Sequence, residues 1–109
     1  MKFDDYQKES RKTALYPDAG KNFVFPVIGL AGETGEVSEK IKKVIRDKDG
    51  IMDGEAKASI KKELGDVLWY IAQLATELDL SLTDIAKSNI DKINSRVERE
   101  MVSGDGDDR

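Results

Sequence analysis

Two short stretches of the chain repeat one arrangement of acidic side chains. Residues 30 to 37 (LAGETGEV) and 60 to 67 (IKKELGDV) share the pattern apolar, two spacers, Glu, any residue, Gly, acid, Val. The acids of the pattern are Glu33 and Glu36 in the first copy and Glu63 and Asp66 in the second. Because side chains three positions apart are neighbours on a helix, each copy predicts a pair of carboxylates on the flank of its apolar stripe.

The chemistry open to these carboxylates is the binding of a hard divalent cation. Two acid pairs brought together repel each other and lose solvation, and a cation removes that cost. The chain contains no His and no Cys, which excludes imidazole bases, thiolate nucleophiles, disulfides and Cys-based zinc sites. Mg²⁺ prefers oxygen ligands and commonly joins carboxylates to substrate phosphates. We therefore predict a Mg²⁺ site, in which Mn²⁺ can substitute.

Apolar periodicity predicts four helices that position these acids. The expected helices cover residues 3 to 15, residues 26 to 48, a third segment from the turn at 53 and 54 to about 79, and a fourth that follows Ser81 as its N-cap. A short loop around residues 48 to 54 joins the second helix to the third. We expect an all-α, four-helix bundle in which these two helices form an antiparallel hairpin, so that their acid pairs converge.

Length and composition set the remaining limits. The chain has 109 residues, of which 39% are apolar and 37% charged, and this fits one small domain, assigned here to residues 1–102. Residues 103–109 are acidic and have nothing to bury, so they are expected to be a disordered tail. A net charge of -4 argues against nucleic-acid binding. With neither a signal segment nor an apolar run of about 20 residues, no membrane contact and a cytoplasmic location are expected.

These motifs resemble the MazG-like nucleotide pyrophosphohydrolases of the all-α NTP pyrophosphatase superfamily. The family signature is EExxE followed, after a gap, by ExxD. Residues 32–36 (GETGE) stand for its first half and residues 63–66 (ELGD) for its second, with a similar run at 67–70 (VLWY). The chain departs from the signature at Gly32, where the family has Glu, so it lacks the carboxylate of that position.

The resemblance implies an activity and a set of residues for it. The expected reaction is Mg²⁺-dependent hydrolysis of a nucleoside triphosphate between the α and β phosphates, giving a monophosphate and pyrophosphate. Glu36 and Glu39 are both candidates for the general base. On the fourth predicted helix, Asn89, Lys92 and Arg96 recur at i, i+3 and i+7 and are candidates for substrate contacts, with a solvated edge as the alternative. Tyr70, one turn beyond Asp66, is a candidate for the nucleobase pocket or for packing.

Self-association is a further expectation. Four short helices hide little apolar surface, and helix glycines such as Gly35 and Gly65 usually have a packing reason. Trp69 points away from the apolar stripe of its helix and is expected to lie in a helix or subunit contact. Together with the resemblance, these features predict a homodimer or homotetramer.

Two other functions compete with this interpretation. In one, the protein is a helical interaction module whose acids are ordinary solvated surface, which is the usual state of a single ExxE pair. In the other, the enzyme belongs to the same superfamily but acts on another phosphate anhydride. A di-iron carboxylate protein is disfavoured because such proteins use Glu-x-x-His ligands.

Overall fold

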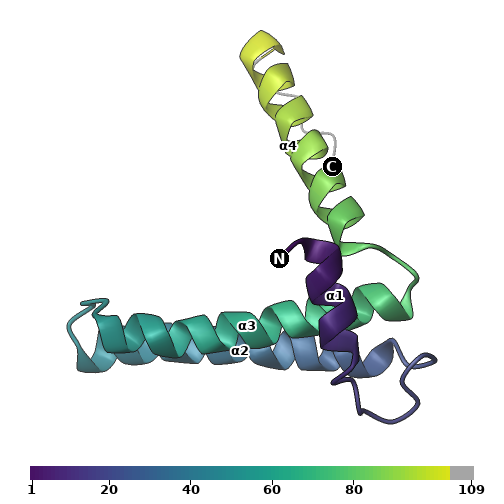
Figure 1. Ribbon diagram of the computed structural model, residues 1–109. Helices are drawn as coiled ribbons and strands as arrows, with labels where there is room; N and C mark the ends of the chain where they lie inside the picture. The colour runs from purple at the N-terminus through teal and green to yellow at the C-terminus, as the bar shows by residue number, and fades with distance from the viewer. Residues whose placement is uncertain (104–109) are drawn as a thin grey trace.

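The computed structural model describes residues 1–103 and contains four α-helices and no strand within that part of the chain (Figure 1). The helices are α1 (Phe3–Arg11), α2 (Val24–Asp47), α3 (Gly54–Glu77) and α4 (Leu82–Ser103). The all-α prediction is confirmed. Ser103 is the last residue of α4, and residues 104–109, where most of the predicted tail falls, lie outside the described residues.

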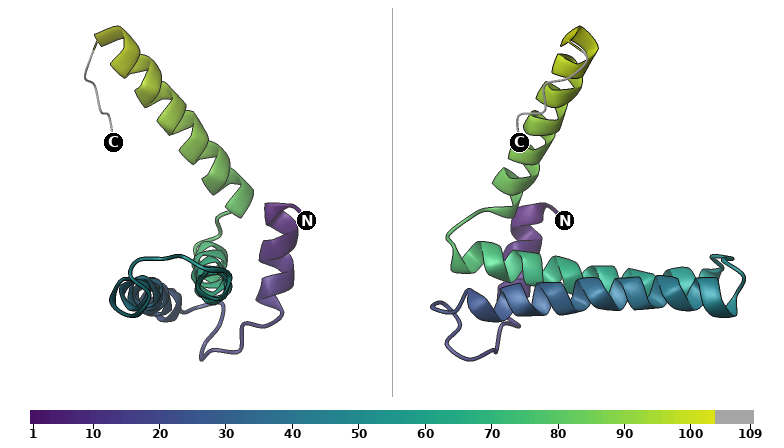
Figure 2. Two further views of the ribbon diagram at one scale, coloured as in Figure 1. Left: turned by 90° about the vertical axis from the view of Figure 1, so that its left-hand side faces the viewer. Right: turned by 180° about the vertical axis from the view of Figure 1, so that it is seen from behind.

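The predicted antiparallel hairpin of α2 and α3 is present, and the two helices run side by side along their whole length (Figures 1 and 2). The chain reverses at Asp49 and Gly50, both of which have a positive φ, a conformation that Gly and Asp tolerate. The Asp53 side chain then accepts a hydrogen bond of 2.8 Å from the Ala56 N–H and caps α3. Turn chemistry and capping thus fix the register in which the two helices meet.

Gly29 of α2 sets how closely the hairpin packs at its open end. A Cβ atom built on Gly29 would overlap the ring of Tyr70 on α3, so the ring occupies the space that a side chain would need. A Cβ atom on Gly35 or Gly65 meets nothing within 4 Å. The close helix contact that helix glycines suggest is therefore made by Gly29, and within one chain it is not made by Gly35 or Gly65.

Replacing Gly29 with alanine is expected to destabilise the fold by about 1 to 3 kcal/mol, because the Tyr70 ring must leave its position. The matched control is Gly35→Ala, which adds the same methyl group to the same helix in open space and is expected to stabilise by up to about 1 kcal/mol. Chemical denaturation of both variants measures the difference. Equal stability of the two variants would show that the Tyr70 ring does not depend on Gly29.

Helix α1 crosses α3 near the C-terminal end of α3 and packs against it through buried polar contacts (Figure 2). The fully buried amide of Gln73 donates 2.9 Å to the Ser10 hydroxyl. The prediction that this helix reaches residue 15 is wrong, because α1 ends at Arg11. The Thr13 hydroxyl explains the early end: it donates to the Ser10 carbonyl and accepts a 2.8 Å bond from the indole N–H of Trp69.

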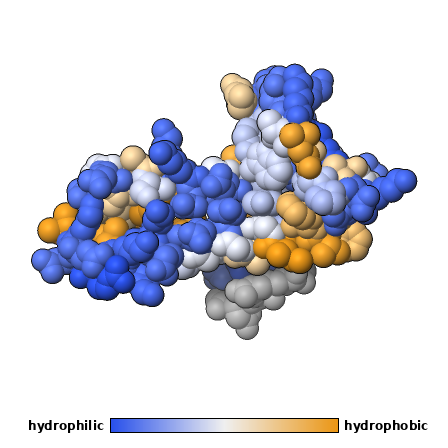
Figure 3. Space-filling model, turned by 90° about the horizontal axis from the view of Figure 1, so that it is seen from below, coloured by the Kyte–Doolittle hydropathy of each residue, from blue (hydrophilic) through white to orange (hydrophobic). Residues whose placement is uncertain are grey.

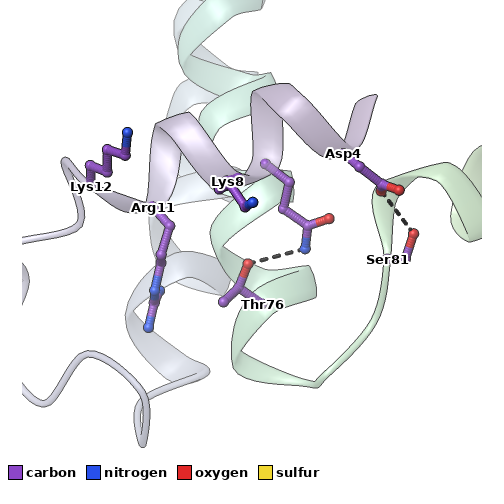
Figure 4. Close-up of a pocket in the computed structure, with 7 residues that line it drawn as sticks. Asp4, Lys8, Arg11, Lys12, Thr76 and Ser81 are labelled. Atoms are coloured by element: carbon purple, nitrogen blue, oxygen red, sulfur yellow. Dashed lines mark hydrogen bonds between the residues drawn. The ribbon is translucent and has the colours of Figure 1, made fainter. Parts of the chain in front are cut away.

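Helix α4 is oriented by α1. The Gln7 side chain donates 2.9 Å to the Leu80 carbonyl and accepts 2.9 Å from the Leu82 N–H, while Asp4 accepts a bond from the Ser81 hydroxyl (Figure 4). The predicted N-cap is confirmed, since Ser81 accepts from the Asp84 N–H at 3.2 Å. Beyond its first turn, α4 extends away from the hairpin instead of lying along it (Figures 1 and 2).

The hairpin has one apolar flank that the chain itself does not cover. A groove of about 360 Å³ on this flank is lined by Ile41, Met52, Ile60 and Leu64 together with two lysines. Leu64 is 53% exposed, and α4 carries its own exposed apolar side chains, Ile85, Ile90, Ile93, Val97 and Met101. Figure 3 shows apolar patches among hydrophilic surface on the face seen from below. In the described part of the chain, no helix is both long enough and apolar enough to cross a membrane.

Candidate metal centre

Three of the four predicted ligands converge on the flank of the hairpin. Glu33 of α2 and Glu63 and Asp66 of α3 each offer one carboxylate oxygen, and these atoms all lie within 4.8 Å of one another. Antiparallel packing of two amphipathic helices brings the two halves of the repeated motif together. The donor set is entirely oxygen, drawn from two helices, and open to solvent on one side because Asp66 is exposed. These features fit Mg²⁺, which takes a few carboxylates and retains water.

The charge state of Glu33 reflects this crowding. Partial burial raises the pKa of Glu33 above its ordinary value of 4.5, and the neighbouring carboxylates Asp66, Glu63 and Glu36 raise it further. Like charges held this close favour either a proton or a cation between them. The site is therefore electrostatically unfavourable without a counter-ion.

Glu36 lies beside this cluster without joining it. Its charge contributes to the raised pKa of Glu33, but its side chain is exposed and is not among the three that share the narrow space. Glu39, the other candidate general base, is in an ion pair of 3.6 Å with Lys42. Of the two, Glu36 is the one placed next to the metal centre.

Tyr70 belongs to a group of aromatic side chains one turn from Asp66. Its ring is 5.0 Å from the Trp69 ring, edge to face, and 6.4 Å from the Phe25 ring. Phe25 in turn stacks on Tyr16 at 4.9 Å. Trp69 is predicted to lie in a helix or subunit contact, and within the chain its contacts are instead with the non-helical segment between α1 and α2. Tyr70 therefore has a packing role against Gly29, at the end of the hairpin flank that carries the acids.

The three candidates on α4 lie apart from the carboxylates in this chain. Asn89 and Lys92 are exposed on a helix that leaves the hairpin after its first turn (Figure 1). Arg96 lies two turns beyond Asn89 on the same helix. For these residues to meet the acid cluster, either α4 must fold back or a second copy of the chain must supply them.

A pocket of about 580 Å³ beside α1 is separate from the metal centre (Figure 4). It is lined by residues of α1 together with Thr76 and Ser81, and it contains none of the four predicted ligands. Two of its cations are already paired, Arg11 with Glu77 at 2.9 Å and Lys12 with Glu9 at 3.2 Å. This pocket is formed where α1 packs against the end of α3 and the start of α4.

Sequence reasoning did not single out Glu77, which fixes the segment between α1 and α2. Its carboxylate accepts hydrogen bonds from the Tyr16 hydroxyl and the Arg11 guanidinium, and from the backbone N–H groups of Gly20 and Asn22. Burial alone raises the pKa of a carboxyl group, but these donors outweigh it and lower the pKa of Glu77 to about 2. Glu77 follows Asp66 by eleven residues and Gln73 by four, so all three lie on one face of the helix, and this spacing is the sequence feature that could have pointed to Glu77.

Adding Mg²⁺ is expected to raise the melting temperature, because the ion binds a site that only the folded chain forms. At a free concentration of about 100 times the Kd, the stabilisation is about 2.7 kcal/mol.

Without metal, stability should also depend on pH, because the pKa of Glu33 is raised on folding. The contribution of Glu33 to stability is present below pH 4.5 and is lost as the pH rises through that raised pKa. Thermal scans from pH 4 to 8 with Mg²⁺ or EDTA measure both effects; identical curves at neutral pH would contradict a metal centre.

The structure is that of an all-α protein with a candidate divalent-metal centre. The centre lies on a hairpin of two long helices, each of which contributes at least one carboxylate from its copy of the repeated motif. The chain belongs to the MazG nucleotide pyrophosphohydrolase family, whose domain matches residues 27–100. It is also similar to the Gene 37 protein of Mycobacterium phage L5, with 42% identity over 114 aligned positions that cover both chains fully. No solved structure matches the chain.

Proposed function

We propose that this protein is a Mg²⁺-dependent nucleoside triphosphate pyrophosphohydrolase, which cleaves a (d)NTP between the α and β phosphates to give a (d)NMP and pyrophosphate. The observation that carries the proposal is the convergence of Glu33, Glu63 and Asp66 within 4.8 Å, inside the segment that matches the family. A solvated charged surface does not need acids from both copies of a repeated motif to meet at one point.

The carboxylates of the cluster and Glu36 have different proposed roles. Glu33, Glu63 and Asp66 hold the cation, and Glu36 either completes the ligand set by a rotation of its side chain or accepts the proton of the attacking water. When bound, Mg²⁺ supplies positive charge to the phosphate oxygens and makes water a better nucleophile. The chain offers no Cys or His for covalent attack, so direct attack by water is the simplest route.

The nucleoside end of the substrate is proposed to lie at the aromatic end of the hairpin flank. Tyr70 and the partly exposed Phe25 are one to two turns from the acids and present ring surface for stacking. Asn89, Lys92 and Arg96 remain proposed substrate contacts that α4 of a second copy could deliver. The base and sugar that are preferred follow from the detailed shape of this region.

A homodimer or homotetramer is proposed on the ground of surface that one chain leaves uncovered. The groove at Ile41, Ile60 and Leu64 is almost entirely apolar, and the exposed stripe of α4 offers a complementary helix. Exposed contiguous apolar surface on two elements of one small domain is typical of an association surface. We assign the groove to a second copy of the chain, with its α4 as the occupant.

The test of the proposed function is pyrophosphate release from a panel of NTPs and dNTPs. Wild-type protein is expected to release pyrophosphate with Mg²⁺, to stop when EDTA is added, and to recover when Mg²⁺ or Mn²⁺ is restored. If a folded protein turns over no nucleotide, other phosphate anhydrides are the next substrates. Failure with those as well would favour a helical interaction module.

A further inference from the structure

A second polar site lies on the acid-bearing flank of the hairpin, one helical turn closer to its closed end. It is a pocket of about 240 Å³ lined by Lys40, Lys43, Lys48 and Ser59, with Asp47, Glu55, Val44 and Ala56. None of the predicted ligands lines it. No motif in the sequence pointed to this pocket or to its lysines.

Helical spacing places the pocket next to the metal centre. Lys40 follows Glu33 by seven residues and Glu36 by four, and Lys43 follows Glu36 by seven, so these lysines continue the face that carries the acids. On α3, Ser59 precedes Glu63 by four residues. Four residues of helix rise about 6 Å and seven rise about 10 Å, so the pocket begins one turn from Glu36 and Glu63 and two turns from Glu33.

Two of the lysines in this pocket, Lys40 and Lys43, form no ion pair among the described side chains. Lys48 pairs with Asp53 at 3.0 Å, and Asp47 pairs with Arg46 at 2.8 Å. Among the described side chains, neither Lys40 nor Lys43 is within 4.0 Å of a carboxylate oxygen. Lys40 is half-buried, which strengthens its field on a bound anion. Asp47 and Glu55 are the two acids of the pocket, and the nearby charge of Lys43 contributes to lowering the pKa of Asp47, after its bond with Arg46.

We propose that Lys40 and Lys43 bind the β and γ phosphates, which leave as pyrophosphate. This inference rests on the proposed function and gives the substrate a direction along the hairpin. The nucleoside faces the aromatic side chains around Tyr70, the α-phosphate lies at the carboxylates, and the pyrophosphate portion reaches the lysines. Cations aimed at the leaving group stabilise the charge that develops on it as the α–β bond breaks.

The geometry favours these lysines over Lys92 and Arg96 as the first phosphate contacts. Lys40 and Lys43 are on the same helix as Glu33 and Glu36, so their distance from the metal centre is fixed by the helix itself. Lys92 is on α4, which leaves the hairpin after its first turn (Figure 2). One chain can therefore present both the carboxylates and the cations from a single hairpin.

The experiment is titration calorimetry of inorganic pyrophosphate, with Mg²⁺ present, into the full-length double variant Lys40→Gln/Lys43→Gln. The matched control is Lys42→Gln/Lys62→Gln, which removes the same charge from the same two-helix hairpin at positions outside this pocket and outside the apolar groove. We expect the Kd of pyrophosphate to rise at least about tenfold in the first variant and less than about twofold in the control. The Kd of the product monophosphate is expected to stay within about twofold in both.

Binding without turnover separates the two proposals. A wild type that releases pyrophosphate from an NTP, beside a Lys40→Gln/Lys43→Gln variant with wild-type pyrophosphate affinity, would overturn the inference and leave the proposed function standing. Equal weakening of pyrophosphate binding in the control variant would also overturn it, because the loss of positive charge anywhere on the hairpin would then explain the weaker binding. A wild type that binds Mg²⁺-pyrophosphate through these lysines but hydrolyses no nucleotide would instead reject the proposed function.

Discussion

Glu63→Gln is expected to lower the rate of pyrophosphate release by at least about 10²-fold. Glutamine keeps the size of the side chain but removes the charge that a Mg²⁺ ligand supplies. Loss of an outer-shell partner of a metal ligand already costs about 10- to 100-fold, so loss of the ligand itself should cost more. Glu63 is half-buried, as Glu33 is, so water can replace it less readily than it can replace the exposed Asp66.

The measurement is kcat/KM for the best nucleotide of the panel, across a range of Mg²⁺ concentrations. Glu98→Gln, on the exposed surface of α4, removes one carboxylate elsewhere and should leave the rate unchanged. Circular dichroism checks that both variants are folded. Activity of Glu63→Gln within a few fold of wild type would show that the cluster is not the catalytic centre.

Glu77→Gln is expected to destabilise the protein by about 3 kcal/mol at neutral pH. The pKa of Glu77 falls from 4.5 to about 2 on folding, and a tenfold change in an acid dissociation constant corresponds to about 1.4 kcal/mol. The carboxylate is only 1% exposed and serves four donors, so solvent cannot take its place. Because the pKa is lowered, this contribution is present above pH 4.5 and is lost as the pH falls through about 2.

Urea denaturation of wild type and Glu77→Gln between pH 2 and 7 tests this expectation. The difference between the two proteins should shrink as the pH falls through the range in which Glu77 takes up a proton. Glu9→Gln is the control, since its ion pair with Lys12 is exposed and should contribute less than about 1 kcal/mol. A constant difference at every pH would assign the effect to packing instead of charge.

The features that sequence predicts well are those set by local periodicity. The acid pairs follow from spacings of three residues, the hairpin from two long apolar stripes joined by a short loop, and the start of α4 from Ser81. Each depends on residues close together in the chain. The convergence of Glu33 with Glu63 and Asp66 then needs only antiparallel packing.

The features that sequence missed depend on contacts between distant segments. Gly29 matters only because the Tyr70 ring lies over it. Glu77 matters because side chains of residues 11 and 16 and backbone N–H groups of residues 20 and 22, all distant in the chain, donate hydrogen bonds to it. The direction of α4 is a further case. Periodicity tells which face of α4 is apolar but not where its axis points, and that direction is set by Gln7 of α1.

The uncovered apolar flank of the hairpin also bears on how this protein should be handled. If its free energy of unfolding includes burial between copies, then stability is a function of protein concentration, and dilution alone lowers the melting temperature. Unfolding measurements on variants are then comparable only at one matched concentration. Assays at nanomolar protein and calorimetry at micromolar protein would sample different populations of the same chain.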